Sequence, residues 1–164
     1  MKRQFIVWMV AMGIAGAFGA PATSSAQVSP TDDATPLDTK FPPEAIVGEW
    51  VTQREENRPP ARFKFVRAND GTYIGIMTWQ ELPQKDTKNP DPKLRNRTLV
   101  GSVILWNLRY DDGEYTGGYI YNPEDGSNYH VKTEVQSPEL LKVRGYLGIS
   151  LLGQNKIWLK YHPS

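Results

Sequence analysis

Polar residues that could bind an anion or transfer a proton are concentrated between residues 81 and 101. This segment contains carboxylates, an amide and two arginines, namely Asp86, Asn89, Asp91, Arg95 and Arg97. Two guanidinium groups can each form paired hydrogen bonds to a carboxylate or phosphate, which would make the segment an anion clamp or a polar lid. Alternatively, the charges pair with one another and hold the segment in shape. Asp86 or Asp91 as a general acid or base is a third interpretation, although nothing in the sequence shows a perturbed environment for either.

The sequence contains no pattern that is typical of a metal site or a catalytic relay. The spacing of Asp86, Asn89 and Asp91 differs from that of an EF-hand loop, and the glycine and terminal glutamate of such a loop are missing. His130 and His162 are the two histidines, and neither has the partners that a metal triad or a Ser-His-Asp relay requires. Cysteine is absent, which excludes disulfides, thiolate nucleophiles and cysteine-based zinc sites. We therefore predict no metal, no cofactor and no enzymatic activity.

Aromatic residues form a second candidate set. Downstream of the N-terminal segment the chain contains Trp50, Trp79, Trp106 and Trp158, together with many tyrosines. These rings could line a cavity that receives an apolar or aromatic ligand. They could equally be core, because the interior of an eight-stranded barrel is just wide enough for side chains to fill it. The choice depends on whether the folded domain is hollow.

From Ile46 onward, short apolar runs alternate with turn signals, three of which end in Asp-Gly, a dipeptide typical of β-hairpins. The predicted strands are 46–54, 62–67, 72–80, 102–110, 114–121, 127–136, 140–147 and 155–162. No downstream segment shows sustained helical periodicity, so we predict an all-β fold, a single eight-stranded antiparallel up-and-down β-barrel. Segment 81–101 would be one long loop between strands three and four. Within it, Asp91-Pro92 predicts the start of a short helix.

The predicted strand 140–147 leaves the direction of Arg144 open. If Val143 points into the barrel, Arg144 is solvated on the outer face, because neighbouring side chains in a strand alternate. If the register is reversed, Arg144 is a buried cation that needs a carboxylate partner. The sequence alone is compatible with both orientations.

The N-terminal residues predict export. A short basic region and an apolar run over 5–20 precede small residues that lead up to Ala26. We therefore predict a signal peptide over 1–26, cleaved between Ala26 and Gln27. The apolar run is short for a membrane span of roughly 20 residues. Because no cysteine follows it, cleavage should leave no stable membrane anchor, and the expected location is periplasmic or secreted.

The rest of the chain divides by composition. Residues 27–44 are rich in Pro, Ser, Thr and Asp, which predicts a flexible leader. The barrel domain would then occupy residues 45–164. The net charge of +1 gives no basic excess, so we expect no nucleic-acid partner.

Two sets of motifs resemble known families. Gly48-Glu49-Trp50 on the first strand, with Lys160 on the last strand or alternatively Arg144 as a cation, resembles the lipocalin and wider calycin pattern. In those barrels the tryptophan closes one end and a cation packs over it, which would make Gly48, Trp50 and Lys160 the structural closure. Four further motifs are similar to a bacterial family of unknown function, found mainly in exported proteobacterial proteins: 85–91, 95–101, 117–126 and 143–146. This resemblance covers residues 46–161 and implies a lipocalin-like fold but no established activity; family members often carry Arg where Lys160 stands.

Together these features predict an exported, non-enzymatic protein that binds a small, partly apolar ligand. Segment 81–101 would gate the barrel. The predicted ligand-binding residues are Trp50, Trp79, Asp86, Asn89, Asp91, Arg95, Arg97, Arg144 and Trp158. The alternative is an envelope module for protein–protein interaction, which docks a sheet face or the long loop on its partner. A sizeable cavity favours the first function, and a large exposed apolar patch favours the second.

Overall fold

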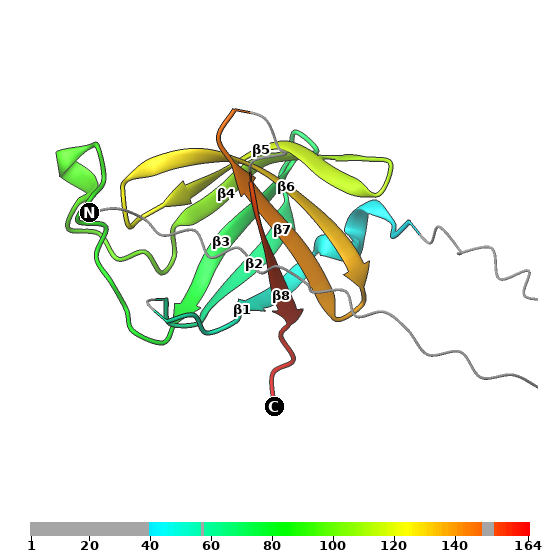
Figure 1. Cartoon of the computed structure of the whole chain (residues 1–164), viewed down its shortest axis with the longest axis horizontal. Coiled ribbons are helices and arrows are strands. Elements are labelled where there is room, and N and C mark those ends of the chain that lie inside the picture. The colour runs from blue at the N-terminus through cyan, green and yellow to red at the C-terminus, as the bar shows by residue number, and fades with distance from the viewer. Residues whose placement is uncertain (1–39, 57, 149–152) are drawn as a thin grey trace, which may run out of the picture. The chain divides into compact units, whose positions relative to one another are not determined.

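In a computed structural model, which describes residues 40–56, 58–148 and 153–164, the strands form one closed antiparallel barrel (Figure 1). The strands are β1 (Gly48–Thr52), β2 (Ala61–Arg67), β3 (Tyr73–Gln80), β4 (Val103–Asp111), β5 (Glu114–Asn122), β6 (Ser127–Ser137), β7 (Leu140–Tyr146) and β8 (Gln154–Lys160). Each strand pairs with the next, and β8 pairs back with β1, so no sheet edge is left open. The predicted eight-stranded up-and-down barrel is confirmed.

Two short 3-10 helices accompany the strands, η1 (Pro43–Ile46) and η2 (Pro92–Leu94). The second confirms the short helix expected after Asp91, whose carboxylate accepts a hydrogen bond from the Lys93 amide at 2.9 Å. Among the described residues, no helix is long and apolar enough to cross a membrane. The predicted signal peptide 1–26 and its cleavage site at Ala26–Gln27 lie outside the described residues.

Alternation of side chains along the strands fills the barrel interior. In β2, for example, Ala61, Phe63 and Phe65 are buried while the residues between them are partly or fully exposed. The buried cluster contains aromatic and large aliphatic side chains from all eight strands, among them Trp50, Phe63, Phe65, Tyr73, Met77, Leu105, Leu108, Tyr115, Val131, Leu141, Val143 and Trp158. Rings and branched side chains of this size occupy the width that eight strands provide. Trp50 and Trp158 of the aromatic set are therefore core, whereas Trp79 is exposed and Trp106 is only partly buried.

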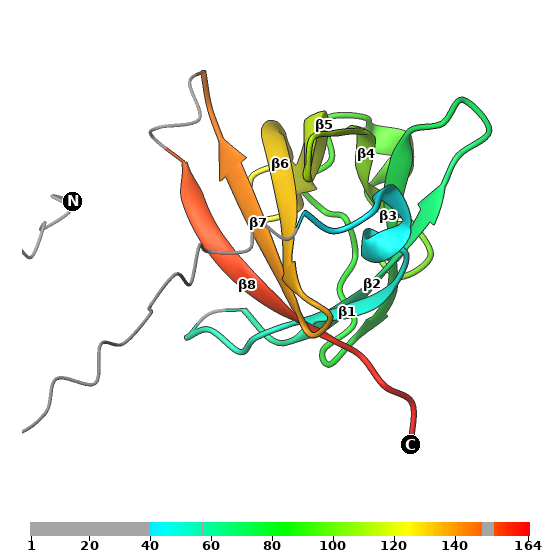
Figure 2. The same ribbon diagram turned by 90° about the vertical axis from the view of Figure 1, so that its right-hand side faces the viewer.

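One end of the barrel, called the closed end below, is crossed by η1 (Figure 2). The indole of Trp50 is 0% exposed there and donates a hydrogen bond to the Ile46 carbonyl at 2.8 Å. The Nζ atom of Lys160 lies 4.4 Å from the Trp50 ring centroid and donates to the Val47 carbonyl at 3.0 Å. Gly48 has a φ of +118°, and a Cβ placed on it would lie 2.8 Å from Lys160 Nζ. The structure thus brings together the three residues expected to close the barrel.

The closed end also includes residues that the sequence assigned to the leader. The Tyr110 hydroxyl donates to the Phe41 carbonyl at 2.7 Å, and the Tyr115 hydroxyl donates to the Pro43 carbonyl at 2.9 Å. Residues 41–44 therefore belong to the folded domain, which corrects the predicted boundary between 44 and 45. Composition misplaced it because prolines in a 3-10 helix look like prolines in a linker.

Candidate functional site

One candidate site is a groove between the end of β3 and segment 81–101. The groove, called the Trp79 groove below, has a volume of about 430 Å³ and is lined by Thr78, Trp79, Gln80, Glu81, Pro83, Thr98 and Val100. Its size falls within the range of roughly 300–1,000 Å³ that is typical of small-molecule sites. Trp79 is 36% exposed, so part of its ring is available to a bound molecule.

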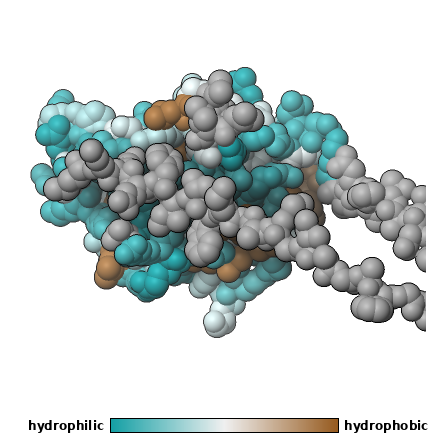
Figure 3. Space-filling view, viewed as in Figure 1, coloured by the Kyte–Doolittle hydropathy of each residue, from teal (hydrophilic) through white to brown (hydrophobic). Residues whose placement is uncertain are grey.

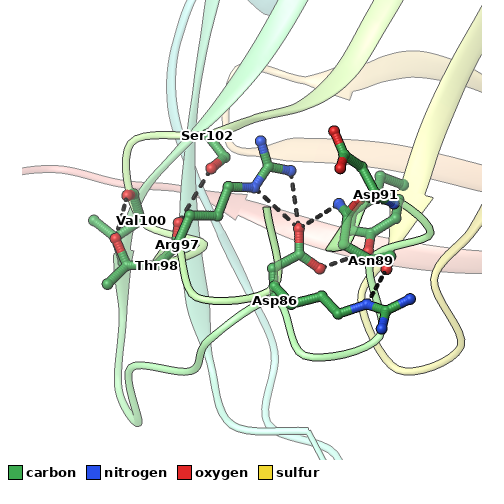
Figure 4. Close-up of polar contacts among 9 residues, drawn as sticks. Asp86, Asn89, Asp91, Arg97, Thr98, Val100 and Ser102 are labelled. Carbon is green, nitrogen blue, oxygen red and sulfur yellow. Dashed lines mark hydrogen bonds and ion pairs between the residues drawn. The ribbon is translucent and has the colours of Figure 1, made fainter. Parts of the chain in front are cut away.

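Segment 81–101 forms one wall of the groove and is held by its own hydrogen bonds (Figure 4). Lys85 and Thr98 form an isolated antiparallel bridge. The Asp86 amide donates to the Arg97 carbonyl at 3.1 Å, and the Leu99 amide donates to the Gln84 carbonyl at 3.2 Å. The two halves of the segment therefore run back along each other instead of forming an open loop.

Asp86 is the centre of this segment. Its side chain is 0% exposed and accepts hydrogen bonds from Tyr121 on β5 at 2.5 Å, from Asn89 at 2.7 Å and from the Arg97 Nε at 3.0 Å. Burial alone would raise the pKa of Asp86, but the hydrogen bonds and the Arg97 charge hold it below its ordinary value. Burial and the Asp86 carboxylate raise the pKa of Tyr121 to about 12. Asp86 is therefore a buried, ionised anchor between the segment and β5.

The remaining polar residues of the segment also bond to one another. The Arg95 Nε donates to the Asn89 carbonyl at 2.8 Å, and the Asp91 amide donates to the Asn89 side chain at 2.9 Å. The structure thus brings the five predicted residues together, but as a network that shapes the segment. The expectation that Arg95 and Arg97 contact a ligand is not supported by this geometry, because Arg97 is committed to Asp86 at 2.9 Å and Arg95 to the backbone.

The segment is packed against the β5–β6 hairpin, and its expected role as a gate stays a prediction. A Cβ on Gly126, in the β5–β6 hairpin, would lie 2.0 Å from the Lys88 carbonyl oxygen, so only glycine permits this close approach. Ile104 and Leu105 are both buried although they are neighbours in β4. Leu105 points inward towards Gly75, so Ile104 points outward and must be covered from outside the barrel. Segment 81–101 lies beside the β5–β6 hairpin in Figure 1.

The other side of the groove is built on the end of β3, which pairs with β2. Arg62 and Trp79 are paired across these strands. The Arg62 guanidinium carbon lies 4.7 Å from the Trp79 ring centroid and 4.2 Å from that of Tyr161. Glu81, also in the lining, forms two hydrogen bonds with the Arg54 guanidinium, at 2.5 and 2.6 Å. The acidic residue of the groove is therefore already neutralised.

Trp79 is the one predicted ligand-binding residue that lines the groove, and three of the others lie on other parts of the barrel. Trp50 is part of the closed end, and Trp158 is buried in the lumen, where it stacks on Phe63 at 4.6 Å. Val143 is buried, so Arg144 points outward, and it donates to the Asn155 side chain at 2.7 Å. The orientation with Arg144 inside the barrel is wrong. These placements follow from strand register, on which the sequence is silent.

Sequence reasoning missed Arg62 and Tyr161. Nothing in the sequence around either residue distinguishes it, and neither belongs to a motif. Their position beside Trp79 depends on the pairing of β2 with β3 and on the chain end that follows β8. An arginine opposite a tryptophan in neighbouring predicted strands would have been the available signal, once the register was known.

A second hollow, of about 280 Å³, lies at the closed end and includes Arg67, Thr72, Tyr73 and Arg109 in its lining. The Tyr73 hydroxyl is buried and has no hydrogen-bond partner among the described residues. Within those residues there is also no group of three or more His, Asp or Glu that could hold a metal ion.

Comparison with known proteins identifies the family. A model for a family described as "Uncharacterized protein conserved in bacteria (DUF2147)" matches residues 48–160. The chain belongs to this family. The match includes all eight strands of this DUF2147 protein and the whole of segment 81–101. A search of curated proteins finds no match.

A solved structure supports the lipocalin-like fold. The structure is described as "Protein HP1028 from the human pathogen Helicobacter pylori belongs to the lipocalin family". That protein is 28% identical to this chain, and the two structures match with a TM-score of 0.66 over 71% of this chain and 83% of that one. The DUF2147 protein therefore has a lipocalin-like barrel, as the Gly48-Glu49-Trp50 motif predicted.

Proposed function

We propose that this DUF2147 protein is an exported, non-enzymatic binding protein whose small, partly apolar ligand occupies the Trp79 groove. The observation that carries the proposal is the composition of that groove. An exposed indole, Pro83 and Val100 provide apolar surface, and a few polar side chains lie beside them. Such a mixture is typical of ligand sites, where apolar area supplies affinity and a few polar groups supply orientation.

The packed interior of the barrel favours the groove, rather than the interior itself, as the ligand-binding site. The buried side chains of the cluster leave little room between the strands, and Trp158 stacks on Phe63 within that cluster. A ligand there would have to displace packed side chains, which typically costs 1–3 kcal/mol or more. A ligand in the groove displaces only solvent.

The rigidity of the groove wall is a further argument. Asp86 fixes segment 81–101 to β5, and Gly126 allows the β5–β6 hairpin to approach it closely. A wall that is already ordered loses little conformational entropy when a ligand binds. A gating motion of this segment would have to break the same contacts, which makes such a motion unfavourable.

The alternative function, protein docking, would require a large contiguous apolar surface. The face in Figure 3 is mostly hydrophilic where the described residues are visible, and its hydrophobic areas are small and separate. On this face, small-ligand binding therefore has the stronger support.

The test is binding to the isolated protein, measured by isothermal titration with aromatic and medium-chain apolar compounds and located by NMR. We expect shifts of the Trp79 indole N–H and the Val100 methyls on titration. Trp79→Ala should weaken binding at least tenfold, because one large aromatic contact is removed. Trp106→Ala is the matched control, since Trp106 is a partly exposed outer-face tryptophan that stacks on Tyr119 instead of lining the groove.

Shifts confined to the methyls of Val131, Leu141 and Val143, with no effect of Trp79→Ala, would place the ligand in the lumen and contradict the groove. Export is tested separately by intact-mass measurement on protein recovered outside the cytoplasm. A mass that still includes residues 1–26 would contradict the predicted cleavage.

A further inference from the structure

We infer that the ligand of the Trp79 groove carries an oxyanion, a carboxylate or a phosphate, and that Arg62 binds it. This inference rests on the proposed function, because it names the chemical class of the molecule in the same groove. Arg62 itself was assigned no role by its sequence context. The argument depends on how its guanidinium is held and on what it lacks.

The Arg62 guanidinium lies close to two aromatic rings. Its carbon is 4.7 Å from the Trp79 centroid and 4.2 Å from the Tyr161 centroid, which are cation–π distances on both. Tyr161 is itself held, because its amide donates to the Glu49 carbonyl at 2.9 Å. Arg62 is therefore fixed beside the same tryptophan that lines the groove.

The contacts of Arg62 contrast with those of other arginines near this end of the barrel. Arg54 is bidentate to Glu81, Arg58 is bidentate to Glu124 at 2.7 Å, and Arg97 contacts Asp86. Within the described part of the chain, the Arg62 side chain forms no hydrogen bond and no ion pair. Among the described residues, the two rings are the groups that compensate its positive charge.

The chemistry of a stacked guanidinium determines what such a site can bind. When a guanidinium stacks on a ring through its planar face, its five N–H donors lie in the plane and stay available. A carboxylate or phosphate matches two of these donors in a parallel pair. Because the rings already restrict the side chain, little further entropy is lost when the anion binds. The apolar part of the ligand would then lie against Trp79.

The experiment uses matched compounds that differ only in the acidic group, with the full-length mature protein. Indole-3-acetate is compared with indole-3-ethanol, and octanoate and octyl phosphate with octanol. We expect each anion to bind roughly tenfold to hundredfold more tightly than its alcohol, which is the range for a hydrogen-bonded charge. The two octyl anions distinguish a carboxylate preference from a phosphate preference.

Arg62→Gln should remove the preference for the anion and leave the affinity for the alcohol within about threefold. Arg62→Lys keeps the charge but loses the planar pair of donors, so it should keep only part of the preference and serves as the second variant if Arg62→Gln folds poorly. Arg67→Gln is the control, because Arg67 is on the same strand but lines the closed-end hollow.

Each result has one meaning. Equal affinity for anion and alcohol, or an Arg62→Gln protein that behaves like Arg67→Gln, would overturn the inference and leave the groove proposal standing. Failure of every compound to bind, or binding that Trp79→Ala leaves unchanged, would refute the groove proposal and the oxyanion inference together.

Discussion

Two regions of the barrel bury a charged group: the closed end, and the region where segment 81–101 is attached to β5, called the segment end below. The two charges have different surroundings. At the closed end, Lys160 lies over Trp50 and donates to a backbone carbonyl, and burial lowers the pKa of its ammonium group. At the segment end, Asp86 is fully buried and receives several hydrogen bonds, one of them from a cation. A half-buried cation needs few partners, whereas a fully buried carboxylate needs almost every acceptor position satisfied.

The difference shows what each contact does. At the closed end, the first and last strands of the barrel are neighbours. Lys160 on β8 adds to a closure that Trp50 and η1 already provide. The segment end attaches a stretch outside the barrel to β5 through one side chain. Stability at the segment end should therefore be concentrated in Asp86, and stability at the closed end should be distributed.

The largest expected effect comes from Asp86→Ala. The change leaves the Arg97 guanidinium and the Tyr121 hydroxyl without their partner, and breaking a buried ion pair typically costs about 3–5 kcal/mol. The free energy of unfolding from urea titration measures the loss. Lys160→Met at the closed end is the comparison and should cost only about 1 kcal/mol. Equal costs would show that the two ends are not organised differently.

Glycine substitutions give the next largest contrast. Gly126→Ala places a Cβ 2.0 Å from the Lys88 carbonyl at a φ of +72°, so backbone must move and we expect a cost of roughly 2–4 kcal/mol. Gly48→Ala meets the flexible end of Lys160 at 2.8 Å, at a φ of +118°. Its cost should be smaller because the Lys160 side chain can move aside. Thermal unfolding of both variants measures the difference, and a larger loss for Gly48→Ala would contradict it.

The pH dependence should also separate the two ends. The pKa of Asp86 is lower in the folded protein than its ordinary value, so its contribution is present above about pH 4 and is lost as the pH falls through the folded pKa. Asp86→Asn removes this titration. Its stability should therefore fall less steeply than that of the wild type below about pH 4, in urea titrations at stepped pH. Parallel curves for the two proteins would show that Asp86 is not the ionised anchor.

The smallest effect is expected within the closed end, from two tyrosines that touch each other. Tyr73→Phe removes a buried hydroxyl with no partner among the described residues, so stability should stay unchanged or rise slightly. Tyr115→Phe removes a hydroxyl that accepts from the Ile46 amide and donates to the Pro43 carbonyl, which should cost about 1–2 kcal/mol. Differential scanning calorimetry compares the pair. A larger loss for Tyr73→Phe would mean that its hydroxyl has a partner in solution.

Much of the fold could be predicted because its signals are local. Alternation in β6 around Val131 and Thr133 indicates which face is buried, and Asp-Gly marks the hairpin turns whatever the rest of the chain does. The candidate site was predicted less well. Polar side chains in segment 81–101 could equally have faced a ligand or one another. The hydrogen bond from Tyr121, which is distant in the sequence, shows that Asp86 faces β5.

The sequence by itself determined the strand order, the closing tryptophan with its glycine, and the family to which the chain belongs, and it left Lys160 and Arg144 as alternatives for the cation. These depend on residue types and on short spacings, which a linear chain carries directly. Only the tertiary structure decided the outward direction of Arg144, the filling of the lumen and the meeting of Arg62 with Trp79 and Tyr161. Those depend on register between strands, and a shift of one residue turns every side chain of a strand to the other face.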